Sequence, residues 1–541
     1  MATFDTQKTS WTLDDALHFG RRAGFGLKPE LAGQLISRPL ASTVDAWVDG
    51  AASETAFTGA VPLANVVDYP GYGNEPDQWA PHPFNLRVEH PANLTEAQSY
   101  WAWRMQYSPN PFKEKLALYW HQHFATGAKK VDNIPLMLKQ IQLFRDLGRG
   151  PFGDLLLAVS QDPAMMIWLD TIQNKVEKSN DVPNENYARE VLELYSLGID
   201  NGYNQKDITE LAKAMTGWDY IGRDFPVADN PYYFNDAEFI VYRGQANPYP
   251  NHPWLQGYTT LPDQRMSGAF TLFGVTLDLG AGSRFGADAI QLILTQRAQA
   301  CATFLSQRLL RFFLNPDLPA NVISDFRDVI LANNFHIGRS LKVLFKSAYF
   351  YEPAHRFALV EGPVAWTVRA AKMLGPDFAT ALQPYQQSAA NLPRFAAWAA
   401  FVNWDTSGFF NMGQDLLNPK GPNGWKEHAA WLNSDTYRHR TRTAYAMAVK
   451  ESRGDDHLHV ERFLFDTDLH EWFPTAPAST LEAFNRLVAL LQPAPIPTGL
   501  RDAWLGLLWT KPFAWDGSAD TENTVRRLAF LILCSPQAQQ H

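Results

Sequence analysis

The spacing of apolar residues is helical from one end of the chain to the other. Apolar side chains recur at intervals of three and four residues, which is the period of one face of an α-helix. The pattern is strongest over residues 14–22, 96–107, 113–124, 133–147, 152–159, 208–216, 288–314, 320–333, 337–347, 363–373, 392–401, 434–451, 481–491 and 522–533. This pattern predicts a mainly α fold, a large multi-helical body.

Residues 219–279 depart from the helical pattern. This stretch is rich in Pro, Tyr, Asn and Gly, with short extended pieces such as Glu238–Tyr242 and Phe270–Leu279. We expect an irregular or small-β insertion laid over the helices. Loops of this length in a compact protein are often functional.

The chain is long for a single hydrophobic core, since it has 541 residues and cores stop growing at about 250–300 residues. No low-complexity linker divides it. We therefore predict one helical body over 1–541, with a sub-lobe 1–360 that carries the motifs and the insertion, and a C-terminal sub-lobe 361–541.

Composition and charge narrow the possible partners. Hydrophobic residues make up 46% of the chain and aromatic residues 13%, which excludes a disordered protein. The net charge is −9, with 47 basic and 56 acidic residues and no basic stripe, so no nucleic-acid partner is expected. Two cysteines cannot form a disulfide framework.

Membrane and targeting signals are not found in this sequence. No apolar run reaches the roughly 18 residues that span a bilayer. The first 19 residues lack the apolar region of a signal peptide. The expectation is a cytoplasmic protein without a membrane span.

Two histidines stand at the end of a predicted helix, in Trp120-His121-Gln122-His123-Phe124. Residues two apart on a regular helix point in nearly opposite directions, so His121 and His123 can bind one ion only if the helix ends between them. Imidazole is the commonest side-chain metal ligand. The alternative is a pair of structural histidines at a helix end.

A second polar segment follows Pro183. With Asn184 as N-cap, a regular helix would place Asn186, Glu190 and Glu193 on one stripe, and Arg189 within reach of Glu193 and of Glu185. One interpretation is an exposed ladder of ion pairs. The other is an oxygen-rich site for a divalent metal or for general acid–base catalysis.

Other known site patterns are weak or missing. The glycines of Gly280-Ala-Gly282-Ser-Arg-Phe-Gly286 resemble a dinucleotide fingerprint, but the third glycine is one place late and no βαβ pattern surrounds them. No nucleotide cofactor is therefore expected. The sequence also lacks a nucleophile elbow, a P-loop and an H-E-x-x-H motif.

Several motifs in a fixed order resemble one uncharacterised bacterial family, domain of unknown function 1800 (DUF1800). They are His18–Gly26, Trp120–Phe124, Asp162–Asp170, Pro183–Gly198, Thr216–Trp218, Met412–Gln414, Asn423–Trp425 and Trp431–Ser434. The resemblance implies a mostly helical body and no particular reaction. Many relatives look exported, and relatives tend to carry His-Asp after the Thr-Gly-Trp motif, where this chain has Phe234-Asn235-Asp236.

The leading hypothesis is a bacterial enzyme with a cleft between two segments: the histidine corner, Trp120–Phe124, and the polar helix that follows Pro183. Hydrolysis is favoured slightly over redox chemistry. A divalent metal would be held by His121, His123 and Glu190, and would activate water. Glu193 would be the general base, Arg189 a substrate clamp and Asp170 the residue that orients a histidine. The expected substrate contacts are Asn186, Arg22, Trp120 and Trp218.

Two other functions stay open. A metal-free carbohydrate-active enzyme would use paired carboxylates and aromatic stacking. A non-catalytic binding or maturation partner of another protein would use the polar motifs as sealed structural networks. The distinguishing observation is whether these side chains line an accessible hollow.

Overall fold

The computed structural model describes residues 3–50, 92–176, 178, 181–220, 258–260, 265–266, 268–278, 286–375, 408–449, 469–508 and 519–541. Its described part is mainly helical, as predicted, and its strands form two small antiparallel pairs. The predicted helix 392–401, the extended piece Glu238–Tyr242 and Asp236 lie outside the described residues. No described helix is long and apolar enough to cross a membrane.

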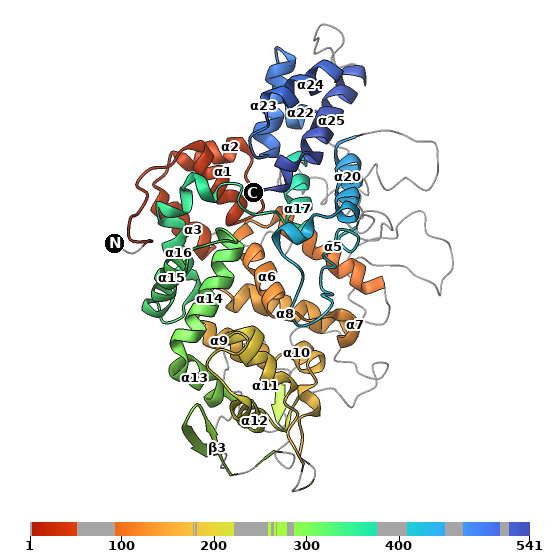
Figure 1. Ribbon diagram of the computed structural model, residues 1–541. Helices are drawn as coiled ribbons and strands as arrows, with labels where there is room; N and C mark the ends of the chain where they lie inside the picture. The colour runs from red at the N-terminus through yellow and green to blue at the C-terminus, as the bar shows by residue number, and fades with distance from the viewer. Residues whose placement is uncertain are drawn as a thin grey trace, which may run out of the picture.

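The first half of the chain forms a layered helical body (Figure 1). The N-terminal helices contact α16 and α6, and the central helices pack against one another. The bounds are α1 Leu13–Arg22, α2 Pro29–Ile36, α3 Leu40–Asp49, α5 Ala92–Tyr107, α6 Pro111–His123, α7 Ala128–Val131, α8 Ile134–Leu147, α9 Phe152–Ser160, α10 Pro163–Trp168, the 3₁₀ turn η1 Thr171–Gln173, α11 Asn186–Glu190, the π-helix η2 Val191–Ser196 and α12 Gln205–Ala214.

The second half completes this body and adds the group of C-terminal helices at the top of Figure 1. Helix α17 packs against α5 from the first half and against α20 and α23 from the second. The bounds are α13 Gly286–Gln296, α14 Ala298–Phe313, α15 Ala320–Ala332, α16 Ile337–Lys346, η7 Tyr349–Tyr351, η8 Pro353–His355, α17 Pro363–Leu374, η10 His428–Trp431, α20 Ser434–Ala448, α22 Leu469–Trp472, α23 Thr480–Leu491, α24 Thr498–Leu508, α25 Ala519–Cys534 and η12 Pro536–Gln539. The division into two sub-lobes stays a prediction, and one apolar core cluster contains residues from both ranges.

The insertion is a small β structure where it is described. Strands β1 Trp218–Tyr220 and β2 Tyr258–Thr260 pair, as do β3 Ala269–Leu272 and β4 Val275–Asp278. The segment predicted as one extended piece is thus a hairpin, because Phe273 and Gly274 both take positive φ values at a tight turn. Two carboxylates of α12 hold it: Asp207 accepts from Phe273 N at 3.0 Å and Glu210 from Thr271 N at 2.7 Å.

The predicted helix 288–314 is two helices that break at Arg297. The backbone of Arg297 leaves the helical region at φ −125°. Its guanidinium lies over the Phe273 ring at 4.4 Å and donates to the Gly202 carbonyl. These contacts to residues distant in the chain are not visible in the helical periodicity.

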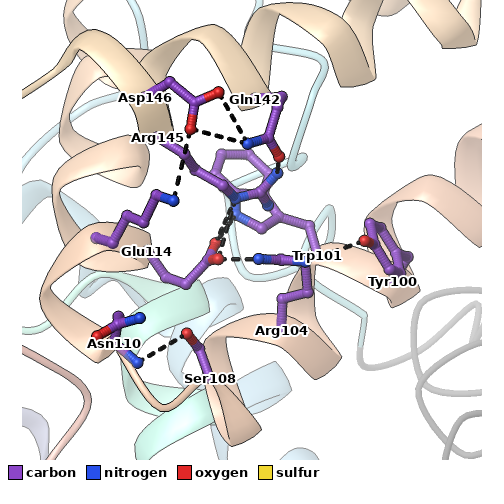
Figure 2. A network of polar contacts seen from close by, with 10 residues as sticks. Tyr100, Trp101, Arg104, Ser108, Asn110, Glu114, Gln142, Arg145 and Asp146 are labelled. Carbon is purple, nitrogen blue, oxygen red and sulfur yellow. Dashed lines mark hydrogen bonds and ion pairs between the residues drawn. The ribbon is translucent and has the colours of Figure 1, made fainter. Parts of the chain in front are cut away.

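A buried ion network joins α5, α6 and α8 (Figure 2). Glu114 is fully buried, and its carboxylate accepts from Arg104 Nε at 3.0 Å, Arg145 Nε at 2.9 Å and the Trp101 indole at 3.1 Å. At its edge the ammonium of Lys113 lies 3.5 Å from Asp146. This network fixes the helix that carries the histidine corner against its two neighbours.

Asp162 caps α10 from a buried position. Its carboxylate accepts from Met165 N at 3.0 Å and from Gln140 Nε2 at 2.7 Å. Burial outweighs these hydrogen bonds and raises the pKa of Asp162 to about 7. At neutral pH this side chain therefore takes up protons far more readily than in the unfolded chain.

The free energy of unfolding should fall as pH rises from about 4 to about 7, because the folded state holds the Asp162 proton that the unfolded state has released. The loss from this group is on the order of 3 kcal/mol. Denaturant unfolding at pH 5 and pH 8 of the wild type and of Asp162→Asn measures it. The variant should lack this part of the pH dependence, whereas Asp154→Asn, at an exposed position of α9, should keep it. Equal pH dependence in wild type and Asp162→Asn would contradict the prediction.

Candidate functional site

The histidine corner is the C-terminal end of α6. The helix runs through His123, and Phe124 N donates to the Trp120 carbonyl at 2.7 Å. Because the helix does not end between His121 and His123, their side chains leave it on different sides. The two imidazoles thus occupy different surroundings.

His121 is sealed among aromatic rings. Its ring lies 5.5 Å from Trp101 and 5.1 Å from Trp425, centroid to centroid, and neither ring nitrogen has a hydrogen-bond partner among the described residues. Burial lowers the pKa of His121 to about 3, so the imidazole is neutral. This is the structural histidine of the alternative interpretation.

His123 points toward the polar helix. Its Nε2 lies 3.0 Å from the Tyr195 carbonyl oxygen. Since a carbonyl only accepts, Nε2 carries the proton and Nδ1 the lone pair. Nδ1 is buried and has no partner in the described structure. Burial, together with the charge of Arg308, lowers the pKa of His123 to about 3.

The polar helix consists of α11 and the π-helix η2, and its geometry changes from α to π at Val191. Helix α11 begins at Asn186 rather than after Asn184, whose side chain instead accepts from Asn186 N at 3.0 Å. At Val191 the chain passes into the π-helix η2, where Leu197 N donates to Leu192 O at 2.9 Å. Glu190 and Glu193 thus lie on either side of this change, and Glu193 remains near enough for its charge to raise the pKa of Glu190. Short π-helices are rare and are often found at functional sites.

The ion-pair ladder is present on this helix. Arg189 lies 3.2 Å from Glu185 and 3.5 Å from Glu193, and it also donates to Gln205. Its guanidinium thus contacts three side chains at the surface. Glu190 is half-buried, and burial, followed by the charge of Glu193, raises its pKa.

A hollow of about 450 Å³ lies where these segments meet. This volume is in the usual range for small-molecule sites. The end of α6, the π-helix, α14 and the loop before Gly424 form its walls. Its lining residues are His123, Glu193, Leu194, Leu197, Gly198, Ile199, Asn201, Phe304, Gln307, Arg308, Pro422 and Asn423.

Arg308 is the cation of this hollow. Its Nε is buried and has no acceptor among the described residues, while Nη1 lies 4.0 Å from Glu427. The hollow thus combines a carboxylate, an imidazole, a guanidinium and three side-chain amides. Such a set can bind a polar molecule and move a proton.

Several residues predicted for the site lie elsewhere. Asp170 pairs with Lys130 at 2.9 Å and accepts from Gln173, so it does not orient a histidine. Asn186 donates to the Leu169 carbonyl at 3.0 Å. Trp120 is buried and donates to the Gly148 carbonyl, and Trp218 is buried in β1 against Gly286. Arg22 is buried in another cluster, described below.

The predicted metal ligands do not assemble. Within the described ranges, no group of three or more His, Cys, Asp or Glu side chains could hold a metal ion. His123 alone has the arrangement of a ligand, since it donates its other ring N–H to a carbonyl. The set His121, His123 and Glu190 thus does not fit a metal centre.

Some residues that line the hollow, and some buried cations, were not predicted from the sequence. Arg308 and Asn423 line the hollow, and Lys115, Arg369 and Arg440 are buried cations. The available signal was a charged residue inside an otherwise apolar helical stretch, as in Pro363–Leu374. Such a residue is seldom fully buried unless it has a partner.

Comparison with known proteins adds one finding. The model of a family described as "Protein of unknown function (DUF1800)" matches residues 18–540. No curated protein matches the chain, and no solved structure matches it.

Proposed function

The chain belongs to the DUF1800 family, and from that premise we propose that it is an enzyme that hydrolyses a small polar molecule in the hollow lined by His123 and Glu193. One observation carries the proposal. Three segments far apart in the chain, each within a motif of the resemblance, contribute His123, Glu193 and Asn423 to one hollow. A purely structural role does not require these polar side chains to line an accessible space.

Glu193 is the general base of the proposed reaction. It is the carboxylate among the lining residues; it contacts Arg189 at 3.5 Å and the Tyr203 hydroxyl. It would take a proton from a water molecule as the water oxygen bonds to the electrophilic atom of the substrate, and would return that proton to the leaving group as the bond between that atom and the leaving group breaks. General bases of this kind contribute about 10²–10⁴ to the rate.

Arg308 and His123 hold the substrate in this scheme. The unpartnered Nε of Arg308 would donate to an oxygen on which negative charge develops. His123, neutral and fixed by its bond to Tyr195, offers Nδ1 as an acceptor. Asn201, Gln307 and Asn423 supply further amide groups.

The other hypotheses receive less support. A metal ion remains a proposal that metal analysis of the purified protein tests, and no step here depends on it. The hollow is lined by one carboxylate, whereas glycosidases generally need two. The hypothesis of a non-catalytic protein is supported by the sealed position of His121, and this support does not extend to the other polar residues.

Replacing Glu193 by glutamine should lower kcat at least about 100-fold, because glutamine cannot take the proton. The measurement is turnover by the purified full chain on a panel of chromogenic esters, amides, phosphate esters and glycosides. Glu185→Gln is the matched control, since Glu185 pairs with the same Arg189 but does not line the hollow.

Thermal unfolding should show that both variants fold. A wild type without turnover across the panel would contradict the proposal. Turnover that survives Glu193→Gln, or that falls equally in Glu185→Gln, would contradict it as well.

A further inference from the structure

Five basic side chains are buried around one carboxylate in a region separate from the hollow. Each is at most 4% exposed, and Glu361 between them is fully buried. They come from α1, α6, α17 and α20: Arg21, Arg22, Lys115, Arg369 and Arg440. We call this group the cation cluster.

Two members of the cation cluster donate several hydrogen bonds each, although Arg440 Nε has no acceptor among the described residues. Arg369 donates to Glu361 at 2.8 Å, to the Ala538 carbonyl at 2.9 Å and to the Leu491 carbonyl. Arg440 donates to the Glu361 carbonyl at 2.7 Å and to Gln539 at 3.0 Å. Glu361 thus forms its ion pair with Arg369 through Oε2, whereas its Oε1 has no hydrogen-bond partner among the described residues and its charge also acts on the other four cations.

The other three members form no ion pair of their own among the described residues, although the charge of Glu361 acts on all three. Arg22 donates to the His355 carbonyl at 2.6 Å, but its Nε and Nη1 have no acceptor among the described residues. Lys115 faces the rings of Phe25 and Phe312, with its ammonium 5.0 and 5.8 Å from their centroids. Arg21 lies over Phe357, and its Nε has no acceptor there either. Contact with a ring stabilises a cation only weakly and does not offset the burial of a charge.

A cavity adjoins the cation cluster. It has about 60 Å³, several times the roughly 10–15 Å³ that one water needs. The lining residues are Lys115, Leu118, Gln122, Phe312, Leu359, Val360, Gly362, Ala365, Gln414, Glu427, His428, Trp431 and His541. Lys115 thus belongs both to the cation cluster and to the cavity wall.

His428 gives a second, independent sign of a ligand. Neither of its buried ring nitrogens has a hydrogen-bond partner in the described part. Its backbone has a φ of +52°, a conformation that L residues adopt at a cost. A strained residue that offers an unpaired imidazole to a cavity is typical of a binding position.

The electrostatics of the cavity favour negative charge. Burial lowers the pKa of Lys115 to about 8; Glu361 opposes this, and Arg22 and Arg369 add to it. Burial and then the charge of Arg22 also lower the pKa of His541. An anion in the cavity would offset these unfavourable interactions.

We propose that this cavity binds a small oxyanion with two negative charges, such as a phosphate or sulfate group, with Lys115 and His428 as ligands in the field of Arg22. The excess of five buried cations over one buried carboxylate, the cavity beside Lys115 and the unpaired nitrogens of His428 carry the proposal. Glu427 also lines the cavity, but its carboxylate pairs with Arg311 at 2.8 Å. This ion pair offsets part of its negative charge.

The test is calorimetric titration of the full-length protein, dialysed into chloride, with inorganic phosphate and with phenyl phosphate. The wild type should bind phosphate, and Lys115→Met should bind at least about tenfold more weakly, as expected for loss of a charged hydrogen bond. Binding of phenyl phosphate as well would identify a phosphoryl group on a larger molecule as the ligand. Binding of inorganic phosphate alone would identify the free ion.

Thermal unfolding separates this effect from general salt effects, since phosphate stabilises most proteins nonspecifically. At equal ionic strength, phosphate should raise the melting temperature of the wild type and of Lys129→Met by about 2 °C more than that of Lys115→Met. Without phosphate, Lys115→Met should be at least as stable as the wild type, because it removes a buried cation. The absence of phosphate binding by the wild type, or equal shifts in all three proteins, would overturn the proposal.

Discussion

Replacing Glu114 by glutamine should lower the free energy of unfolding by about 3–5 kcal/mol, because the change leaves two buried arginines without their counter-ion. Arg104 and Arg145 are each 3% exposed and both donate to this carboxylate (Figure 2). Arg145 Nη2 already lacks an acceptor among the described residues. Denaturant unfolding of both proteins at one pH measures the difference.

Asp146→Asn provides the control at the edge of the same network. Asp146 pairs with Lys113 across 3.5 Å, and both side chains are partly exposed. The expected loss is below about 1 kcal/mol, as for other ion pairs near the surface. A loss of that small size for Glu114→Gln would show that the network does not hold the three helices together.

Replacing Glu361 by glutamine should destabilise the protein by at least the same amount, about 3–5 kcal/mol. Glu361 faces the five buried members of the cation cluster, and the remaining acid that acts on Arg21 is Asp14, on the exposed side of α1. The variant leaves Arg369 with carbonyl partners alone. Unfolding in chloride buffer, compared with the exposed Glu352→Gln, measures the loss.

A second substitution checks the cause of this loss. Arg369→Met in the Glu361→Gln background should recover part of the lost stability, since it removes the cation that the first change left unpaired. If the two losses simply add, the pair is not coupled and the electrostatic explanation is wrong.

The helices were predictable because their signal is local. The predicted ranges 133–147 and 152–159 agree with α8 and α9 within a residue. The start of α12 differs from the predicted residue 208: the helix begins at Gln205 with Asn204 as its N-cap, and Asp207 completes the capping box. In the sequence, Asp207 and Glu210 fit a capping box as well, yet the hairpin β3–β4 uses both carboxylates.

The candidate site was predictable only in part. The sequence pointed to His123 and Glu193, which the structure brings to one hollow. It did not distinguish His123 from His121, because the neighbours of each imidazole come from distant segments of the chain and leave no local signal. Trp101 and Trp425, which enclose His121, come from segments that are 324 positions apart in the numbering.

The amino-acid sequence by itself determined the family, the helical class and the positions of most helices, since these depend on motifs and on the three- and four-residue spacing of apolar side chains. Only the tertiary structure decided which polar residues line a cavity and which are enclosed by other side chains. A charged side chain within an apolar helix has the same local pattern whether its counter-ion is present or missing. Lys115 and Glu114, neighbours on α6, illustrate the difference: packing gives Glu114 two arginines and gives Lys115 two aromatic rings beside a cavity.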